Sequence, residues 1–177
     1  PPYGDDMNVF DFAMEMEDSG YEYYSDLART SSQPGLKTIF NSLAEDEQKH
    51  FNLFRSLKEG NPAALKAESK TVARAKNIFK ELTANAAAAS QPGSTLEAYQ
   101  HAMKLEADSF RFYEDAAARE KDEQVKKLLL QIAEEEHGHF TILENLYNFV
   151  NAPNENLEWG EFSNLGEFRQ YGRDLDK

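Results

Sequence analysis

The 177-residue sequence contains no cysteine. This absence excludes disulfides, thiolate zinc sites, thiol redox chemistry and iron centres bound by cysteine within the chain. Basic residues are also scarce, because 19 Lys and Arg face 32 Asp and Glu and leave a formal net charge of −13. A uniformly acidic surface repels nucleic acid and anionic lipid, so we expect neither as a partner.

Long hydrophobic runs are absent as well. No apolar stretch approaches the roughly 20 residues of a membrane span, and no signal-peptide pattern opens the chain, so a soluble cytoplasmic protein is the expectation. Hydrophobic residues nevertheless make up 40% of the sequence and include 12 Phe and 8 Tyr. That content is enough for one well-packed core, and it predicts a single globular domain rather than a disordered chain.

An internal repeat organises the first 150 residues. A Glu-x-x-His pattern occurs twice, 89 residues apart, and the same shift carries a further Glu of one copy onto a Glu of the other. The six residues are Glu17, Glu47 and His50 in the first copy, and Glu106, Glu136 and His139 in the second. Because the copies match without a gap, each is expected to be a helix–turn–helix hairpin, and two hairpins facing each other make a closed four-helix bundle.

Helical periodicity and the Pro and Gly breaks predict four long helices and one connection. The helices are expected over about 6–30, 35–59, 95–120 and 122–150. The segment without a copy, about 61–93, should cross between the hairpins and contain a short helix marked by Val72, Ile78, Phe79 and Leu82. We therefore predict an all-α fold with a four-helix bundle over 1–151. The apolar residues of 152–177 predict an extension that packs on the bundle or on a partner subunit.

Both Glu-x-x-His pairs lie on the apolar stripe of their helices. The stripes read Phe40, Leu43, Glu47, His50, Phe54, Leu57 and Leu129, Ile132, Glu136, His139, Leu143, Leu146. Residues spaced by three and four share one helix face, so the polar pairs should point into the core. Four buried carboxylates are untenable for the bare chain, whereas two divalent cations neutralise them and each His adds a nitrogen ligand. The pattern predicts a dinuclear site for Fe, Mn or Zn with the six residues as ligands.

The alternative for each residue is a structural role. Glu134 and His137 form a third Glu-x-x-His, which we expect on the solvent side because Glu134 leaves the stripe and the first copy has Gln48 in place of the His. Even the duplicated set could be a decayed site that keeps its residues and holds no metal in cells.

Two pairs of matched residues are candidates for hydrogen bonds that support the ligands. Tyr24 and Tyr113 follow Glu17 and Glu106 by seven residues, and could donate hydrogen bonds to the ligand carboxylates or form a redox gate, although plain core packing fits equally well. Asp46 and Glu135 precede the ligand Glu residues and could accept the second N–H of a ligand His. For these two acids a solvated helix face is the favoured interpretation.

The sequence resembles the ferritin-like superfamily, and within it the rubrerythrin group, over roughly residues 6–150. The resemblance is carried by Ala13-x-x-x-Glu17 with Tyr24, by Leu43-Ala44-x-x-Glu47-x-x-His50-Phe51, and by their counterparts in the second copy. It implies a non-haem di-iron centre in which Glu47 and Glu136 bridge the irons while Glu17 and Glu106 are terminal ligands. It also implies oxidoreductase activity toward hydrogen peroxide in oxidative stress, or oxidation of Fe(II) as in the ferritin branch. The residues assigned to catalysis are Glu47, Glu136, Tyr24 and Tyr113.

Two features depart from that family pattern. Rubrerythrins carry a rubredoxin domain whose four Cys hold the iron that delivers electrons, and because this chain has no Cys we expect a separate electron-donor protein. Rubrerythrins also carry an additional Glu three residues after the position of Glu106. Here that position is Ser109, with Gly20 as its counterpart in the first copy, which leaves six protein ligands.

Three functions stay open on the sequence. The first is reduction of hydrogen peroxide, the second is oxidation of Fe(II) by O₂, and the third is a metal-stapled structural or interaction module without catalysis. A homodimer is expected in each case.

Overall fold

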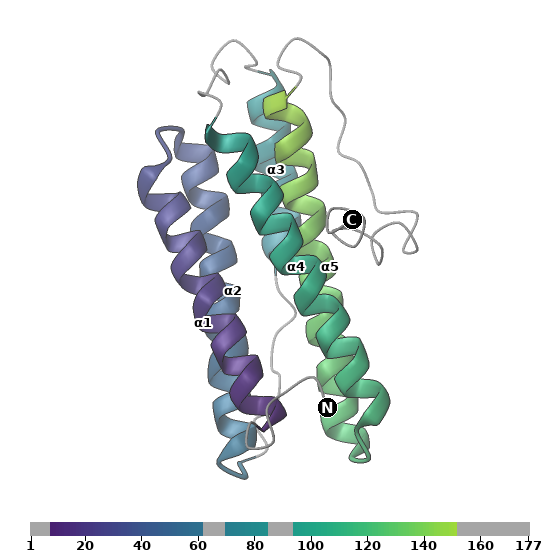
Figure 1. Ribbon diagram of the computed structural model, residues 1–177. Helices are drawn as coiled ribbons and strands as arrows, with labels where there is room; N and C mark the ends of the chain where they lie inside the picture. Colours follow the sequence, from purple (N-terminus) through teal and green to yellow (C-terminus); the bar gives the residue numbers. More distant parts are fainter. Residues whose placement is uncertain (1–7, 62–69, 85–93, 152–177) are drawn as a thin grey trace, which may run out of the picture. The chain divides into compact units, whose positions relative to one another are not determined.

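The computed structural model describes residues 8–61, 70–84 and 94–151 (Figure 1). Its helices are α1 (Val9–Thr30), α2 (Pro34–Lys58), α3 (Thr71–Ala84), α4 (Ser94–Arg119) and α5 (Glu123–Asn151). The described ranges contain no strand, so the predicted all-α class is confirmed and is consistent with a helical bundle. The predicted C-terminal extension, 152–177, lies outside the described residues.

Each long hairpin belongs to one of two compact units, Pro1–Thr71 and Val72–Lys177. In the first unit α1 and α2 lie side by side, and in the second α4 and α5 do so (Figure 1). The 89-residue shift found in the sequence carries Thr30 onto Arg119 and Pro34 onto Glu123, so both hairpins turn at equivalent places. The predicted repeat of helix, short turn and helix is confirmed.

Local capping residues explain where the helices begin. Asn8 precedes α1 with an extended backbone, and its side-chain oxygen accepts from the Phe10 N–H at 2.9 Å. Asp122, which the sequence placed at the start of the fourth helix, instead caps it and accepts from the N–H groups of Gln124 at 2.8 Å and Val125 at 3.2 Å. Pro34 occupies the first turn of α2, where its missing N–H costs nothing.

The end of α2 is set by Gly60, which has a positive φ of 73°. The Gly60 N–H donates to the Leu57 carbonyl at 3.1 Å and the Asn61 N–H donates to the Ser56 carbonyl at 2.9 Å. This pair of bonds is a Schellman motif, which favours glycine because residues with a Cβ rarely adopt the left-handed conformation.

The crossover contains the short helix that the sequence predicted, as α3. Within the second unit α3 approaches α5 closely, because a Cβ built on Gly138 would come within 2.7 Å of the Val72 Cγ2. The glycine therefore allows this approach one residue before His139.

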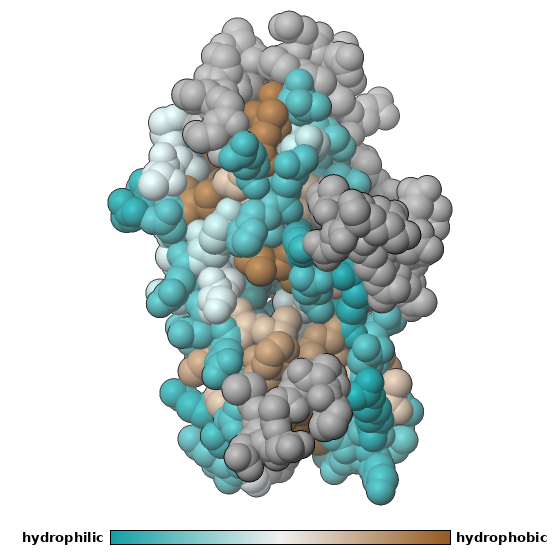
Figure 2. All heavy atoms as spheres, viewed as in Figure 1, coloured by the Kyte–Doolittle hydropathy of each residue, from teal (hydrophilic) through white to brown (hydrophobic). Residues whose placement is uncertain are grey.

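The surface of the described helices is largely polar. Figure 2 shows hydrophilic side chains over much of the face in view, with smaller hydrophobic areas among them. None of the helices in the described ranges is both long enough and apolar enough to cross a bilayer.

Candidate metal centre

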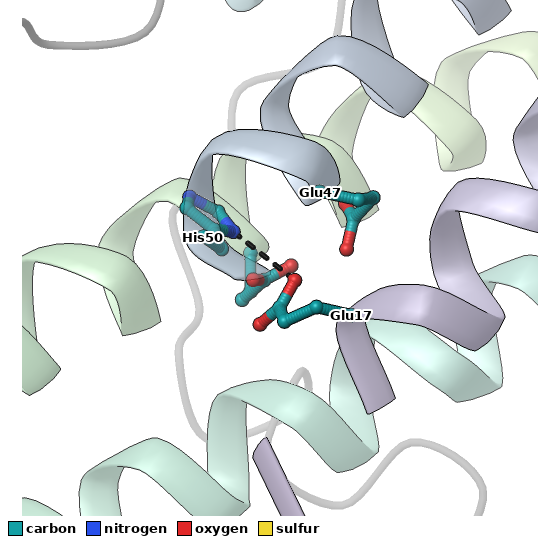
Figure 3. A group of neighbouring side chains, drawn as sticks. Glu17, Glu47 and His50 are labelled. Atoms are coloured by element: carbon teal, nitrogen blue, oxygen red, sulfur yellow. Dashed lines mark ion pairs between the residues drawn. The ribbon is translucent and has the colours of Figure 1, made fainter. Parts of the chain in front are cut away.

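The first half-site consists of Glu17 from α1 and Glu47 with His50 from α2 (Figure 3). All three side chains are buried, and His50 Nδ1 lies 3.3 Å from Glu17 Oε2. One ligand atom from each residue lies within 4.8 Å of the others. The three side chains thus turn their donor atoms toward one small volume.

The apolar stripe of α2 places this half-site. Phe40, Leu43 and Phe54 are fully buried on the same helix face as Glu47 and His50, as their spacing of three and four predicts. Because these hydrophobic residues before and after the polar pair are buried on this face, Glu47 and His50 also point into the core.

The second half-site repeats the first with Glu106 from α4 and Glu136 with His139 from α5. These side chains are also buried. His139 Nδ1 lies 3.6 Å from Glu106 Oε2 and 3.4 Å from Glu136 Oε2, and one ligand atom of each residue again falls within 4.8 Å of the others. In both half-sites the same imidazole nitrogen faces the carboxylate of the neighbouring helix.

Burial makes the second half-site electrostatically costly when no cation is present. It raises the pKa of Glu106 to about 8, with a further rise from the charge of Glu136 and a partial offset from His139. The carboxyl group therefore keeps its proton at neutral pH in the metal-free protein. A bound cation would favour the ionised form and displace that proton.

The metal-free protein is expected to lose stability as pH rises from about 5 to about 8. Over this range folded Glu106 retains a proton that the unfolded chain has released, so raising the pH favours unfolding. One such proton corresponds to about 1.4 kcal/mol of unfolding free energy per pH unit. Urea denaturation of the metal-free protein at several pH values measures the slope. Glu106→Gln should flatten it, and an equally steep slope in that variant would contradict the assignment.

The donor set fits a transition-metal ion. Each half-site offers two carboxylates and one imidazole nitrogen, a set that suits Fe, Mn or Zn, and the described residues contribute no thiolate. Buried carboxylates grouped in this way need a cation or protons to offset their charge. The six predicted ligands are thus brought together as two equivalent sets of three, each within its own unit.

Tyr24 and Tyr113 are fully buried in their respective units. Each packs against the aromatic residue before it in an edge-on arrangement, with ring centroids 6.1 Å apart for Tyr23 and Tyr24 and 5.2 Å apart for Phe112 and Tyr113. These contacts support the packing role that the sequence left open. The role of either phenol at the ligand carboxylates stays a prediction.

The favoured interpretation of Asp46 as a solvated residue is wrong. Its side chain is buried, and its two oxygens accept from Thr71 Oγ1 at 2.5 Å and from Lys49 Nζ at 2.7 Å. Thr71 lies 25 residues away at the start of α3, so no helical spacing within α2 could reveal the contact. Glu135, the counterpart, is half-buried.

Thr71→Val is expected to destabilise the protein, because it removes the hydroxyl that donates to the buried Asp46 carboxylate. A hydrogen bond to a charged group contributes about 1.5 to 3 kcal/mol. Thr71→Ser keeps the donor and serves as the control, with a loss below about 1 kcal/mol. Chemical denaturation of both variants measures the difference, and a loss in Thr71→Val no larger than that in Thr71→Ser would contradict the expected contribution of the hydrogen bond.

The third Glu-x-x-His behaves only partly as predicted. The Glu134 side chain is 80% exposed, as expected, but that of His137 is only 15% exposed. The ring of Phe110 from α4 lies 6.0 Å from the imidazole, and burial lowers the pKa of His137. The prediction that His137 lies on the solvent side is therefore wrong, because its imidazole is largely buried with the ring of Phe110 beside it.

Two helix hairpins that each bury two Glu and one His at equivalent positions define a duplicated carboxylate–histidine protein. The family model described as Rubrerythrin matches residues 8–147, a range that includes both half-sites, and the chain belongs to this family. Comparisons with curated proteins and with solved structures found no match.

Proposed function

We propose that this protein is a non-haem di-iron oxidoreductase that reduces hydrogen peroxide to water with electrons from a separate donor protein. The observation that carries the proposal is the duplication of a buried set of two carboxylates and one imidazole nitrogen on equivalent hairpins. Membership of the rubrerythrin family supports iron as the metal.

In this proposal the two hairpins form one bundle and their half-sites hold a pair of irons together. Four Glu supply four negative charges and two divalent ions balance them, whereas a single ion in one half-site would leave the other half-site uncompensated. Glu17 and Glu47 of the first half-site and Glu106 and Glu136 of the second would supply the carboxylate oxygens that hold the ions. The histidines would each complete one ion through Nδ1, the nitrogen that faces the carboxylates.

The chemistry divides between the metals and the chain. Bound iron supplies Lewis acidity and the two electrons that, with two protons, convert one hydrogen peroxide into two waters. The chain holds its carboxylates at fixed positions and surrounds them with buried apolar residues such as Phe40 and Ile132, which exclude bulk water. Tyr24 and Tyr113 are proposed to act as phenol donors near the ligand carboxylates.

Electrons must then reach the site from outside these 177 residues, because the sequence has no Cys to bind a rubredoxin-type iron. A separate donor protein fits this requirement.

Oxidation of Fe(II) by O₂, with iron as the substrate, is the second candidate. The residue that favours it is Ser109, which stands at the position of the additional Glu in rubrerythrins, and its counterpart in the first copy, Gly20, supplies no ligand either. With six protein ligands rather than seven, the site has one fewer carboxylate to retain iron through a redox cycle.

Rapid mixing separates the two candidates. Protein loaded anaerobically with Fe(II) is mixed with H₂O₂ or with O₂ while the near-UV absorption of ferric iron is followed. Much faster oxidation by H₂O₂ supports the peroxidase, and equal or faster oxidation by O₂ supports the second candidate. If neither oxidant produces the absorption, the di-iron proposal is wrong.

A further inference from the structure

The absence of a side chain at Gly20 leaves space for the Glu47 carboxylate. Gly20 is buried on α1, one turn after Glu17, in the same unit as Glu47. A Cβ built on Gly20 would lie 2.9 Å from Glu47 Oε2, 3.2 Å from Cδ and 3.3 Å from Cγ. The end of the Glu47 side chain therefore rests against the α1 backbone, in space that any other residue would fill.

Backbone conformation does not explain this glycine. Among the described glycines only Gly60 has a positive φ, so Gly20 has ordinary helical geometry. A helix with glycine at an interior position is less stable than the same helix with alanine, because glycine loses more backbone freedom on folding. What the position requires is space for the Glu47 side chain.

The matched position of the second half-site differs. The residue of α4 that corresponds to Gly20 is Ser109, which carries a Cβ and a hydroxyl and is half-buried. The two half-sites thus have the same ligand types but different neighbours one turn after the first Glu.

We propose that Gly20 is a positioning residue that sets the place of the Glu47 carboxylate and thereby the metal affinity of the first half-site. The inference rests on the proposed metal site. With a side chain at position 20, Glu47 must swing away from α1 and from the donor atoms of Glu17 and His50. Metal coordination tolerates only a few tenths of an ångström, so this displacement weakens binding.

Gly20→Ala tests the inference because it should move stability and metal affinity in opposite directions. The obstructing atoms belong to the flexible end of Glu47, so the metal-free variant should fold and gain about 2 to 4 °C in Tm from the better helix former. Its affinity for Co(II), titrated anaerobically and followed by visible absorption, should fall about 10- to 100-fold. Ser109→Ala is the matched control, and its Co(II) affinity should stay within about twofold of wild type.

A second substitution tests whether the loss of affinity comes from steric overlap between the side chain at position 20 and Glu47. Glu47→Asp shortens the side chain and should weaken Co(II) binding by wild-type protein, but it should recover part of the lost affinity in the Gly20→Ala background. Equal losses in both backgrounds would overturn the inference.

The remaining outcomes are also decisive. Wild-type affinity in Gly20→Ala, or a loss of both stability and affinity, overturns the positioning role while leaving the proposed function intact. No Co(II) binding by wild-type protein overturns the proposed function and this inference together.

Discussion

Glu136→Gln is expected to abolish tight metal binding while making the metal-free protein more stable than wild type near pH 8. The amide keeps the shape of the side chain but removes its charge, which contributes to the raised pKa of Glu106. Repulsion within the second half-site therefore falls when no ion is bound. The same change removes a ligand carboxylate, and affinity should drop by more than about 100-fold. Co(II) titration and urea denaturation of the metal-free protein measure the two effects.

Glu134→Gln is the matched control for this substitution. It lies two residues earlier on α5, carries the same change in charge, and its side chain is largely exposed. Its metal affinity should equal that of wild type. If Glu136→Gln binds Co(II) as tightly as this control, Glu136 is not a ligand.

Metal loading is expected to raise the thermal stability of the wild-type protein substantially. An ion that binds only the folded state at about 1,000 times its dissociation constant stabilises that state by about 4 kcal/mol. For a domain of this size, that free energy corresponds to a rise in Tm of about 8 to 16 °C. Calorimetry with and without a chelator measures the shift. The rise has a direct physical cause, because the cation offsets the charge of buried carboxylates such as Glu106, whose pKa is raised by burial when no cation is bound.

Substitution of the imidazoles provides the comparison for metal loading. His50→Ala and His139→Ala each remove one nitrogen donor from a different half-site and should lose most of the rise in Tm. His101→Ala, on the exposed side of α4, should keep the full rise. A full rise in all three variants would mean that the stabilising ion binds elsewhere.

The sequence predicted the ligand helices well because two independent signals agree there. The three-and-four spacing around Glu47 indicated a buried face, and the ungapped repeat indicated that Glu136 lies in the same position of a second hairpin. The structure buries both residues and places the two turns at matching positions. Helical periodicity depends on residue spacing within one helix, and a repeat depends on the match between two helices of the same chain. Both can therefore be recognised from the amino-acid sequence alone.

Contacts between distant segments could not be predicted, because they depend on residues of another helix rather than on spacing within one. Asp46 seemed solvated because its own helix gives no sign of Thr71, and His137 seemed solvated because Phe110 belongs to another helix. The role of Gly20 depends on the distance between its backbone and a side chain of α2. A sequence shows which face a residue occupies but not which neighbour covers it.

The most direct test of the central claim is an anaerobic Mn(II) titration of the metal-free protein followed by electron paramagnetic resonance. The account predicts two ions per chain and a signal from a spin-coupled pair, because both half-sites are proposed to form one dinuclear centre. Substitution of Glu47 and Glu136 together by Gln should remove that signal. Two uncoupled ions, a single ion, or a coupled signal that survives the double substitution would contradict the account.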